Sequence, residues 1–143
     1  MRDVMDTFNL IELQKELERD EGRRTKPYKD THDIWTIGVG WNLEENPLPE
    51  AIIDQLFHIS TNRAIEDAEA VFSNFEELSQ VRQRVLVNMA LNLGRGRLRA
   101  FKKTIKAVKH GDWERAAAEI LDSDAARELK NRYGRLAKMM RDG

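Results

Sequence analysis

The chain has no cysteine among its 143 residues, and proline and glycine are scarce, with 3 and 8 copies. The missing thiols exclude disulfide bonds, thiolate metal sites and cysteine nucleophiles. The scarcity of proline and glycine excludes collagen-like and low-complexity proteins. Hydrophobic residues at 41% and charged residues at 34% instead indicate a globular chain that is long enough to bury a core.

Long apolar runs are missing as well. No segment approaches the run of about 18 apolar residues that a membrane-spanning helix needs. Residues 1–20 lack the apolar core and the small-residue cleavage site of a secretory signal. We therefore expect a protein that is made in a cytoplasm, is not exported by a cleaved signal and does not insert into a membrane.

A net charge is almost absent overall, at -1, but not locally. Residues 1–80 hold 8 Lys and Arg against 18 Asp and Glu, whereas residues 81–143 hold 16 against 7, so the halves carry -10 and +9. The basic half favours a polyanionic partner, either a nucleic acid or an acidic polymer such as a bacterial wall. Solvated charges on two halves that attract each other explain the pattern equally well.

Histidines are few, and their positions do not indicate a metal site. His32, His58 and His110 are scattered without the close spacing of metal ligands. Because cysteine is absent too, we expect neither a metal nor another cofactor.

The first part of the chain predicts a helix followed by a small sheet. Leucines recur at helical spacing in residues 9–21, so we expect a helix there. In residues 25–41, two short β-rich runs flank a DTHD turn, which is typical of a hairpin or a three-strand antiparallel ribbon.

Beyond the prolines near residue 49, the sequence predicts helices almost to its end. Residues 60–72 are amphipathic but thinly apolar, which indicates a partly solvated helix that connects two lobes. Residues 81–94 are apolar nearly all round and predict the central buried helix of the second lobe, with Gly94 and Gly96 ending it.

These elements together predict an α+β fold in a single domain over residues 1–143. A small antiparallel sheet lobe is expected at about 10–60, and a mostly helical, basic lobe at about 75–143. A helix connects the two lobes.

Two carboxylates and a threonine frame the predicted ribbon. Glu21 closes the first helix, Asp30 sits at the hairpin turn and Thr36 lies on the returning strand. Cleavage of a glycosidic bond needs one protonated carboxyl group, one ionised carboxylate and an ordered water, which these residues can supply. Because the chain carries 25 acidic residues, a chance pair with Asp30 as a simple turn former is an open alternative.

A longer string of residues is more specific. It runs Glu21-Gly22, five residues, Tyr28, one residue, Asp30, five residues, Thr36-Ile37-Gly38, one residue and Gly40. The string resembles the active-site segment of the phage-type lysozyme family. Over about 10–143, the chain is similar to the same family at further positions, namely Val87-Asn88-Met89, Leu93-Gly94, Phe101, Trp113, Ala116-Ala117 and Asn131-Arg132.

The resemblance implies a lysozyme-like fold, with two lobes and a cleft between them, and the activity of an endolysin. The substrate it implies is the β-1,4 bond between N-acetylmuramic acid and N-acetylglucosamine in peptidoglycan. It makes Glu21 the general acid, Asp30 the general base or electrostatic partner, and Thr36 the residue that positions water. The substrate contacts that it implies are Asn42, Leu91, Asn92, Thr104, Glu119 and Arg132, the last as the arginine that pairs with the acid.

The resemblance also implies a monomer that binds bacterial peptidoglycan and waits in the cytoplasm of the host bacterium until lysis. Trp41, Asn42, Leu91 and Glu119 differ in type from the residues of that family, so the sugar subsites are expected to differ. Trp35 and Trp41, near the ribbon, are candidates for stacking on sugars, whereas Trp113 fits the start of a helix against the core.

Two other functions stay open. A catalytically silent lysozyme-like module could serve as a structural or wall-binding part of a phage particle, although the intact Glu21, Asp30 and Thr36 favour an enzyme. Nucleic-acid binding through the basic half is the third possibility. The basic run RGRLRAFKK lacks a helix-turn-helix or an aromatic stacking pattern, so we expect no nucleic-acid partner.

Overall fold

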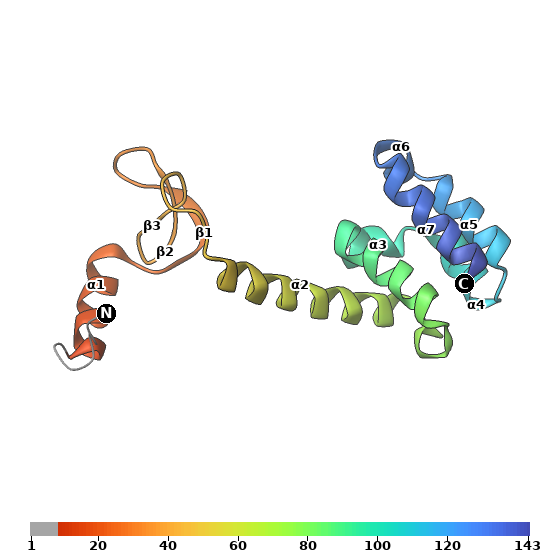
Figure 1. Ribbon diagram of the computed structural model, residues 1–143, viewed down its shortest axis with the longest axis horizontal. Helices are drawn as coiled ribbons and strands as arrows, with labels where there is room; N and C mark the ends of the chain where they lie inside the picture. Colours follow the sequence, from red (N-terminus) through yellow and green to blue (C-terminus); the bar gives the residue numbers. More distant parts are fainter. Residues whose placement is uncertain (1–8) are drawn as a thin grey trace. The chain divides into compact units, whose positions relative to one another are not determined.

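The computed structural model describes residues 9–143, which divide into two compact units between Ile53 and Asp54 (Figure 1). The first unit holds a short helix and a small sheet, and the second is helical. This is the α+β fold that the sequence predicts.

The helix expected at residues 9–21 is present as α1, Leu10–Glu21. Asn9 caps its start, because its Oδ1 accepts a hydrogen bond from the N–H of Glu12 at 3.2 Å. Gly22, at φ 78°, ends the helix in a conformation that favours glycine. None of the residues of α1 is buried within the part of the chain described.

A three-stranded antiparallel sheet follows, in the order β1-β2-β3. Its strands are β1 Arg24–Lys29, β2 Trp35–Gly38 and β3 Trp41–Asn42. The central strand places Thr36 between Tyr28 on β1 and Asn42 on β3. The ribbon predicted for residues 25–41 is therefore confirmed, in its three-strand form.

The long helix α2, Glu50–Val71, contains most of the thinly apolar stretch predicted at 60–72. Of its residues only Ala64 and Ala68 are buried. Small side chains at this four-residue spacing face one side of a helix and allow a close approach of its neighbours.

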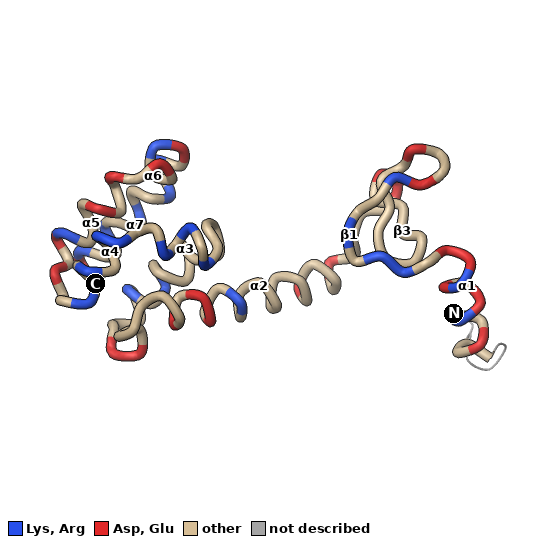
Figure 2. Tube along the Cα trace, turned by 180° about the vertical axis from the view of Figure 1, so that it is seen from behind, with Lys and Arg blue, Asp and Glu red and all other residues tan. Residues whose placement is uncertain are grey.

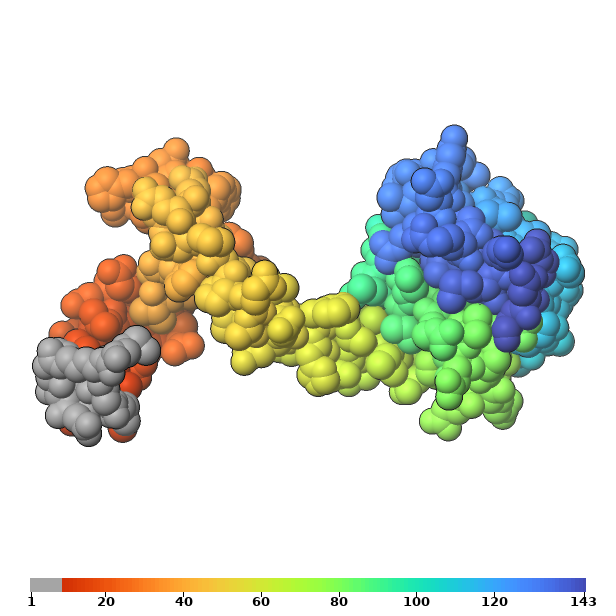
Figure 3. Space-filling model, in the orientation of Figure 1, coloured from red at the N-terminus to blue at the C-terminus, as the bar shows by residue number. Residues whose placement is uncertain are grey.

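The second unit includes most of α2, and the helices that follow it form the body coloured green to blue in Figure 3. After a short 3-10 turn, η2 at Phe75–Glu77, these are α3 Gln80–Arg99, α4 Lys102–Lys109, α5 Trp113–Leu121, α6 Asp124–Glu128 and α7 Lys130–Asp142. None of the helices within residues 9–143 has the length and apolar character that crossing a membrane requires.

The core of the second unit is centred on α3, as residues 81–94 predict. Val85, Leu86 and Met89 are fully buried there. Gly94 interrupts the helix, with φ 76° and ψ 166°. The chain then turns helical again, so the expectation that Gly96 also ends the helix is wrong: Gly96 lies inside the continuation.

Trp113 opens α5 and packs against this core, as its place in the sequence predicts. The guanidinium of Arg82 lies over the indole, 3.9 Å from the centre of a ring. Arg82 also donates from Nε to the carbonyl of Met140 at 2.8 Å. Arg82 on α3 therefore contacts both α5 and α7.

Candidate active site

Glu21 is the last residue of α1, and its carboxyl group lies against the backbone of Gly40 in the β2–β3 turn. A Cβ atom added at Gly40 would lie 2.9 Å from Oε2 of Glu21 and 3.1 Å from its Cδ. Gly40 also has φ 69°, which other residues rarely adopt. The last glycine of the string therefore suits the turn, and its lack of a side chain leaves room for the Glu21 carboxyl group.

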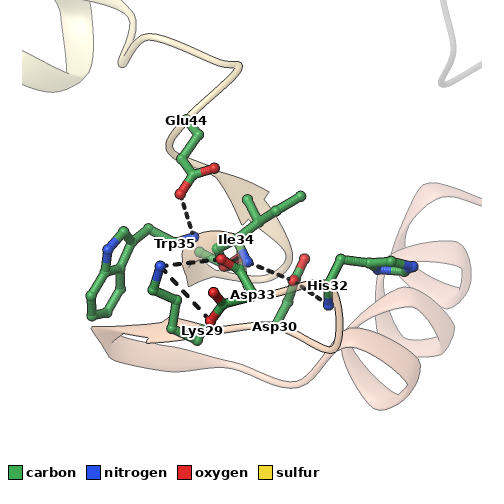
Figure 4. A network of polar contacts seen from close by, with 8 residues as sticks. Lys29, Asp30, His32, Asp33, Ile34, Trp35 and Glu44 are labelled. Carbon is green, nitrogen blue, oxygen red and sulfur yellow. Dashed lines mark hydrogen bonds and ion pairs between the residues drawn. The ribbon is translucent and has the colours of Figure 1, made fainter.

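Asp30 follows β1 at the start of the β1–β2 turn and is held by the backbone of that turn. Its Oδ1 accepts hydrogen bonds from the N–H of His32 at 2.8 Å and of Ile34 at 3.0 Å (Figure 4). The role of Asp30 as a turn former is therefore real. Both bonds use the same oxygen, which leaves Oδ2 without a hydrogen bond among residues 9–143.

These bonds favour the ionised form of Asp30 and lower its pKa below the ordinary value. The N–H of Ile34 is the main cause, and partial desolvation opposes it. The N–H of His32 and the charges of His32 and Lys29 lower the pKa further. Asp30 is therefore a carboxylate at neutral pH.

Thr36 is 3% exposed and is the only buried residue within residues 9–53. Its Oγ1 donates a hydrogen bond to the carbonyl of Ile34 at 2.9 Å. Because its proton is used in this way, the hydroxyl can only accept from a further partner such as water. The backbone of Ile34 holds both polar groups, Asp30 through its N–H and Thr36 through its carbonyl.

Asn42, predicted to contact substrate, caps the loop that follows β3. Its Oδ1 accepts from the N–H of Glu44 at 2.9 Å and of Glu45 at 3.0 Å. The amide oxygen is therefore engaged locally, and the amide nitrogen is the atom that a ligand would meet.

Arg132, at the start of α7 in the second unit, is oriented by Asn88 on α3. Its Nε donates to Oδ1 of Asn88 at 2.9 Å, and its Nη2 donates to the Asn88 carbonyl at 3.2 Å. Sequence reasoning placed Asn88 only in a buried helix and missed this role. The signal was there, because Asn88 is a polar residue within a stretch that is otherwise apolar nearly all round.

Asn92, four residues further along α3, has a structural partner. Its Oδ1 accepts from the hydroxyl of Tyr133 at 2.6 Å. Tyr133 is fully buried, and burial raises the pKa of its phenol. A buried phenol needs such a partner, so part of the hydrogen-bonding capacity of Asn92 serves the core.

The remaining predicted contacts lie on two separate hollows of the second unit. Thr104 and Glu119 line one of about 340 Å³, where Glu119 also accepts from Nε of Arg115 at 2.8 Å. Leu91 is 46% exposed and lines another hollow of about 620 Å³. Asn88 lines this second hollow too.

Within residues 9–143, no cluster of three or more His, Asp and Glu is arranged to hold a metal ion.

Comparison with known proteins gives a consistent set of relatives. A family model described as "Phage lysozyme" matches residues 18–136. "Probable T4-type lysozyme 1" of Dictyostelium discoideum is 24% identical over 157 residues, which cover 89% of this chain and 92% of that protein. "Probable T4-type lysozyme 2" of the same organism is 24% identical over 160 residues, covering 92% of this chain and 94% of that protein.

A third relative is of a different kind. The "Pre-baseplate central spike protein Gp5" of Enterobacteria phage T4 is 27% identical over 161 residues. The match covers 93% of this chain but only 28% of that protein. A chain of this type therefore occurs as one part of a larger phage protein.

Proposed function

The chain belongs to the phage lysozyme family, and from this premise we propose that it hydrolyses the β-1,4 bond between N-acetylmuramic acid and N-acetylglucosamine in bacterial peptidoglycan. The observation that carries the proposal is the geometry of three side chains. Glu21 rests on Gly40, while Asp30 and Thr36 are both held by the backbone of Ile34. Local hydrogen bonds thus hold Asp30 and Thr36, and Glu21 lies beside the Gly40 backbone.

Glu21 is the general acid in this proposal. Protonated, it gives its proton to the glycosidic oxygen as the bond to the leaving sugar breaks. Its carboxyl group lies beside Gly40 and is exposed, so a glycosidic oxygen can come within hydrogen-bond reach of it.

Asp30 and Thr36 together position the attacking water. Asp30 is ionised and offers Oδ2, while the Thr36 hydroxyl can only accept. A water that donates one hydrogen to each of them is left with a lone pair directed away from both. If that lone pair attacks the anomeric carbon, Asp30 takes the proton as general base and the configuration is inverted.

This mechanism requires the carboxyl groups of Glu21 and Asp30 to lie about 6.5–9.5 Å apart, which leaves room for the water. A retaining enzyme, in which Asp30 would attack the sugar itself, needs about 5–5.5 Å. Proton NMR of the fresh reducing end distinguishes the two. An α anomer formed first supports inversion, and a β anomer formed first contradicts the role of Asp30 as base.

The substrate contacts of the family are part of the proposal. Arg132, fixed by Asn88, presents a cation to acidic groups of the peptidoglycan. The other contacts proposed on the second unit and on β3 are Leu91, Asn92, Thr104, Glu119 and Asn42. Because Asn92 and Asn42 have local partners for their amide oxygens, we expect their nitrogens to meet the substrate.

The decisive experiment compares wild type with Glu21→Gln on purified peptidoglycan. The amide keeps the shape of the side chain but cannot donate a proton at working pH, so the rate should fall by about 10²–10⁴. Glu16→Gln is the matched control, since it makes the same change on an exposed position of α1. A Glu21→Gln variant with more than a tenth of wild-type activity would contradict the assignment of the acid.

The second candidate function is a catalytically silent module of a phage particle. The match to part of a protein named as a central spike favours it. Wild-type protein that binds peptidoglycan but releases no muropeptides would support this alternative. Mass spectrometry of any products also tests the reaction type, because anhydro sugars would indicate a transglycosylase and contradict hydrolysis.

A further inference from the structure

The sheet of the first unit has two faces, and its tryptophans lie on the face opposite Thr36. Paired residues of an antiparallel sheet point to the same side, and successive residues alternate. Thr36 pairs with Tyr28 and with Asn42, which together define one face. Lys29 pairs with Trp35, and Ile37 pairs with Trp41, so both indoles are on the other face.

Both indoles are large apolar groups that remain accessible. Trp35 is 45% exposed and Trp41 is 36% exposed. The N–H of Leu43 bonds to the carbonyl of Trp35 at 2.9 Å, which continues the pairing of β2 with β3. Trp35 and Trp41 are therefore diagonal neighbours, whose Cα atoms lie about 7–8 Å apart in such a pair.

Charged side chains lie close to Trp35, one over its ring and one at its backbone. Nζ of Lys29 lies 4.7 Å from the centre of a ring, and it also donates to the carbonyl of Asp33 at 3.1 Å. Oε1 of Glu44 accepts from the Trp35 backbone N–H at 3.4 Å. Figure 4 shows Lys29 alongside the indole, with Glu44 and Asp33 close by.

Trp41 is held through its ring nitrogen. Its Nε1 donates to the carbonyl of Asn46 at 3.2 Å. The Trp41 indole is thus oriented by a hydrogen bond and the Trp35 indole contacts the Lys29 ammonium, which lowers the entropic cost of binding.

We propose that this face, made by Lys29, Asp33, Trp35, Trp41 and Glu44, is a second saccharide-binding site for a neutral amino sugar of the glycan strand. A pyranose ring presents a face of C–H groups to an indole, and its hydroxyl and acetamido groups meet the flanking polar side chains. The site holds the strand outside the catalytic residues. The inference rests on the proposed function for the identity of the polymer.

The local charges select a sugar over other ligands. The carboxylate of Asp33 lies 3.9 Å from Nζ of Lys29, and that of Glu44 accepts from the backbone N–H of Trp35, so two carboxylates and one ammonium flank this residue. Over residues 22–49, which form the sheet and its turns, four Lys and Arg stand against four Asp and Glu, so the net charge there is zero. A surface without net positive charge does not attract phosphate-rich polymers or anionic membranes, whereas its carboxylates accept hydrogen bonds from sugar hydroxyls.

The test measures binding in a Glu21→Gln background, where the ligand is not cleaved. The probe is a soluble oligomer of N-acetylglucosamine, titrated by calorimetry and by the NMR signals of the indole N–H groups. Trp35→Ala should weaken this binding about tenfold, since an aromatic stacking contact contributes of the order of one factor of ten. Trp35→Phe should retain most of it. Ile11→Ala, at a 65% exposed position of α1, is the control and should change nothing.

The NMR titration of the protein with both tryptophans intact protects the test against misfolding of a variant. The indole signals of Trp35 and Trp41 should shift as the oligomer is added, with the assignment made from the Trp→Phe variants. Indoles that do not respond to the oligomer would overturn the inference. A response only to anionic vesicles, or only to protein concentration, would also overturn it in favour of a lipid surface or a second copy of the chain.

The result separates this inference from the proposed function. If wild type cleaves peptidoglycan and Trp35→Ala binds the oligomer as tightly as the parent, the second site is wrong and the hydrolase stands. If wild type cleaves nothing but the indoles still bind the oligomer, the hydrolase is wrong and the site stands.

Discussion

Each of the two units is stabilised internally by a different kind of interaction. Every buried hydrophobic residue identified in residues 9–143 lies between Ala64 and Met140, in the second unit. Within residues 9–53 the only buried residue is Thr36. The first unit, which carries Glu21 and Asp30, therefore depends on backbone hydrogen bonds and glycine conformations, whereas the second depends on apolar packing.

The apolar core and the candidate catalytic residues therefore lie in different units. Packed helices tolerate few changes of volume, because each lost methylene group leaves a cavity. A hairpin held by a carboxylate and two glycines tolerates volume changes on its surface but not changes at those positions. We therefore expect the same kind of substitution to have opposite consequences in the two units.

The largest effect on stability is expected in the core of the second unit. Leu86→Ala removes a fully buried side chain from α3 and should lower the free energy of unfolding by about 2–5 kcal/mol. Ile11→Ala, on the exposed face of α1, should change it by about 0.5 kcal/mol or less. Urea unfolding followed by circular dichroism measures both. Equal losses would mean that α1 is packed as tightly as the core and would remove the contrast.

The next effect is on activity and concerns the contact between the Glu21 carboxyl group and Gly40. Gly40→Ala adds a Cβ atom 2.9 Å from Oε2 of Glu21 and should lower kcat by about 10- to 100-fold, because it displaces the acid. Gly38→Ala is the matched control. Gly38 has φ 67°, close to the 69° of Gly40, but a Cβ atom there meets nothing within 4 Å.

Both glycine variants should lose similar stability from the strained backbone, so their difference in kcat isolates the displaced carboxyl group. If Gly38→Ala were as inactive as Gly40→Ala, the effect would come from the ribbon as a whole. The contact between Glu21 and Gly40 would then have no role of its own in catalysis.

These cases show how far the sequence determines the site. The ribbon, the helix ending at Glu21 and the positions of Asp30 and Thr36 follow from turn residues, strand alternation and a recognisable string. The contact between Glu21 and Gly40 does not, since it depends on how α1 and the β2–β3 turn meet in space. Asn88 was missed for the same reason, because its partner Arg132 lies 44 residues away in the chain.

The third effect is on pH dependence. The N–H groups of Ile34 and His32 lower the pKa of Asp30 in the folded state, while in the unfolded chain it returns to about 3.9. A carboxylate with a lowered pKa stabilises the fold above the unfolded value, and this contribution is lost as the pH falls through the folded value. We therefore expect the first unit to lose stability below about pH 4.

Unfolding of wild type and Asp30→Asn between pH 7 and pH 2 measures this dependence. The difference in stability between the two should be greatest near neutral pH and should shrink toward acid. The acidic limb of kcat/KM should also lie below the ordinary range of an aspartate, because Asp30 must be ionised to act as base. A gap that stays constant with pH would show that the hydrogen bonds do not favour the charged form.

The smallest effect concerns the charges of the second unit, shown in Figure 2. Residues 81–143 carry 16 Lys and Arg against 7 Asp and Glu, and on α4 the exposed side chains include Lys102, Lys103, Lys106 and Lys109. None of these four lysines forms an ion pair within the part of the chain described. Free cations of this kind draw the protein to an acidic wall polymer, and salt screens such attraction over about 8 Å at physiological ionic strength.

We therefore expect activity on whole peptidoglycan to fall several-fold between low and physiological salt, while activity on an uncharged oligosaccharide stays constant. The variant Lys106→Gln/Lys109→Gln should flatten the salt curve without changing the rate on the oligosaccharide, since neither lysine lines the hollow of Thr104 and Glu119 or is among the catalytic residues. A wild-type curve that is already flat on peptidoglycan would show that the basic unit does not recruit the substrate, and that its charges are simply a solvated surface over the core.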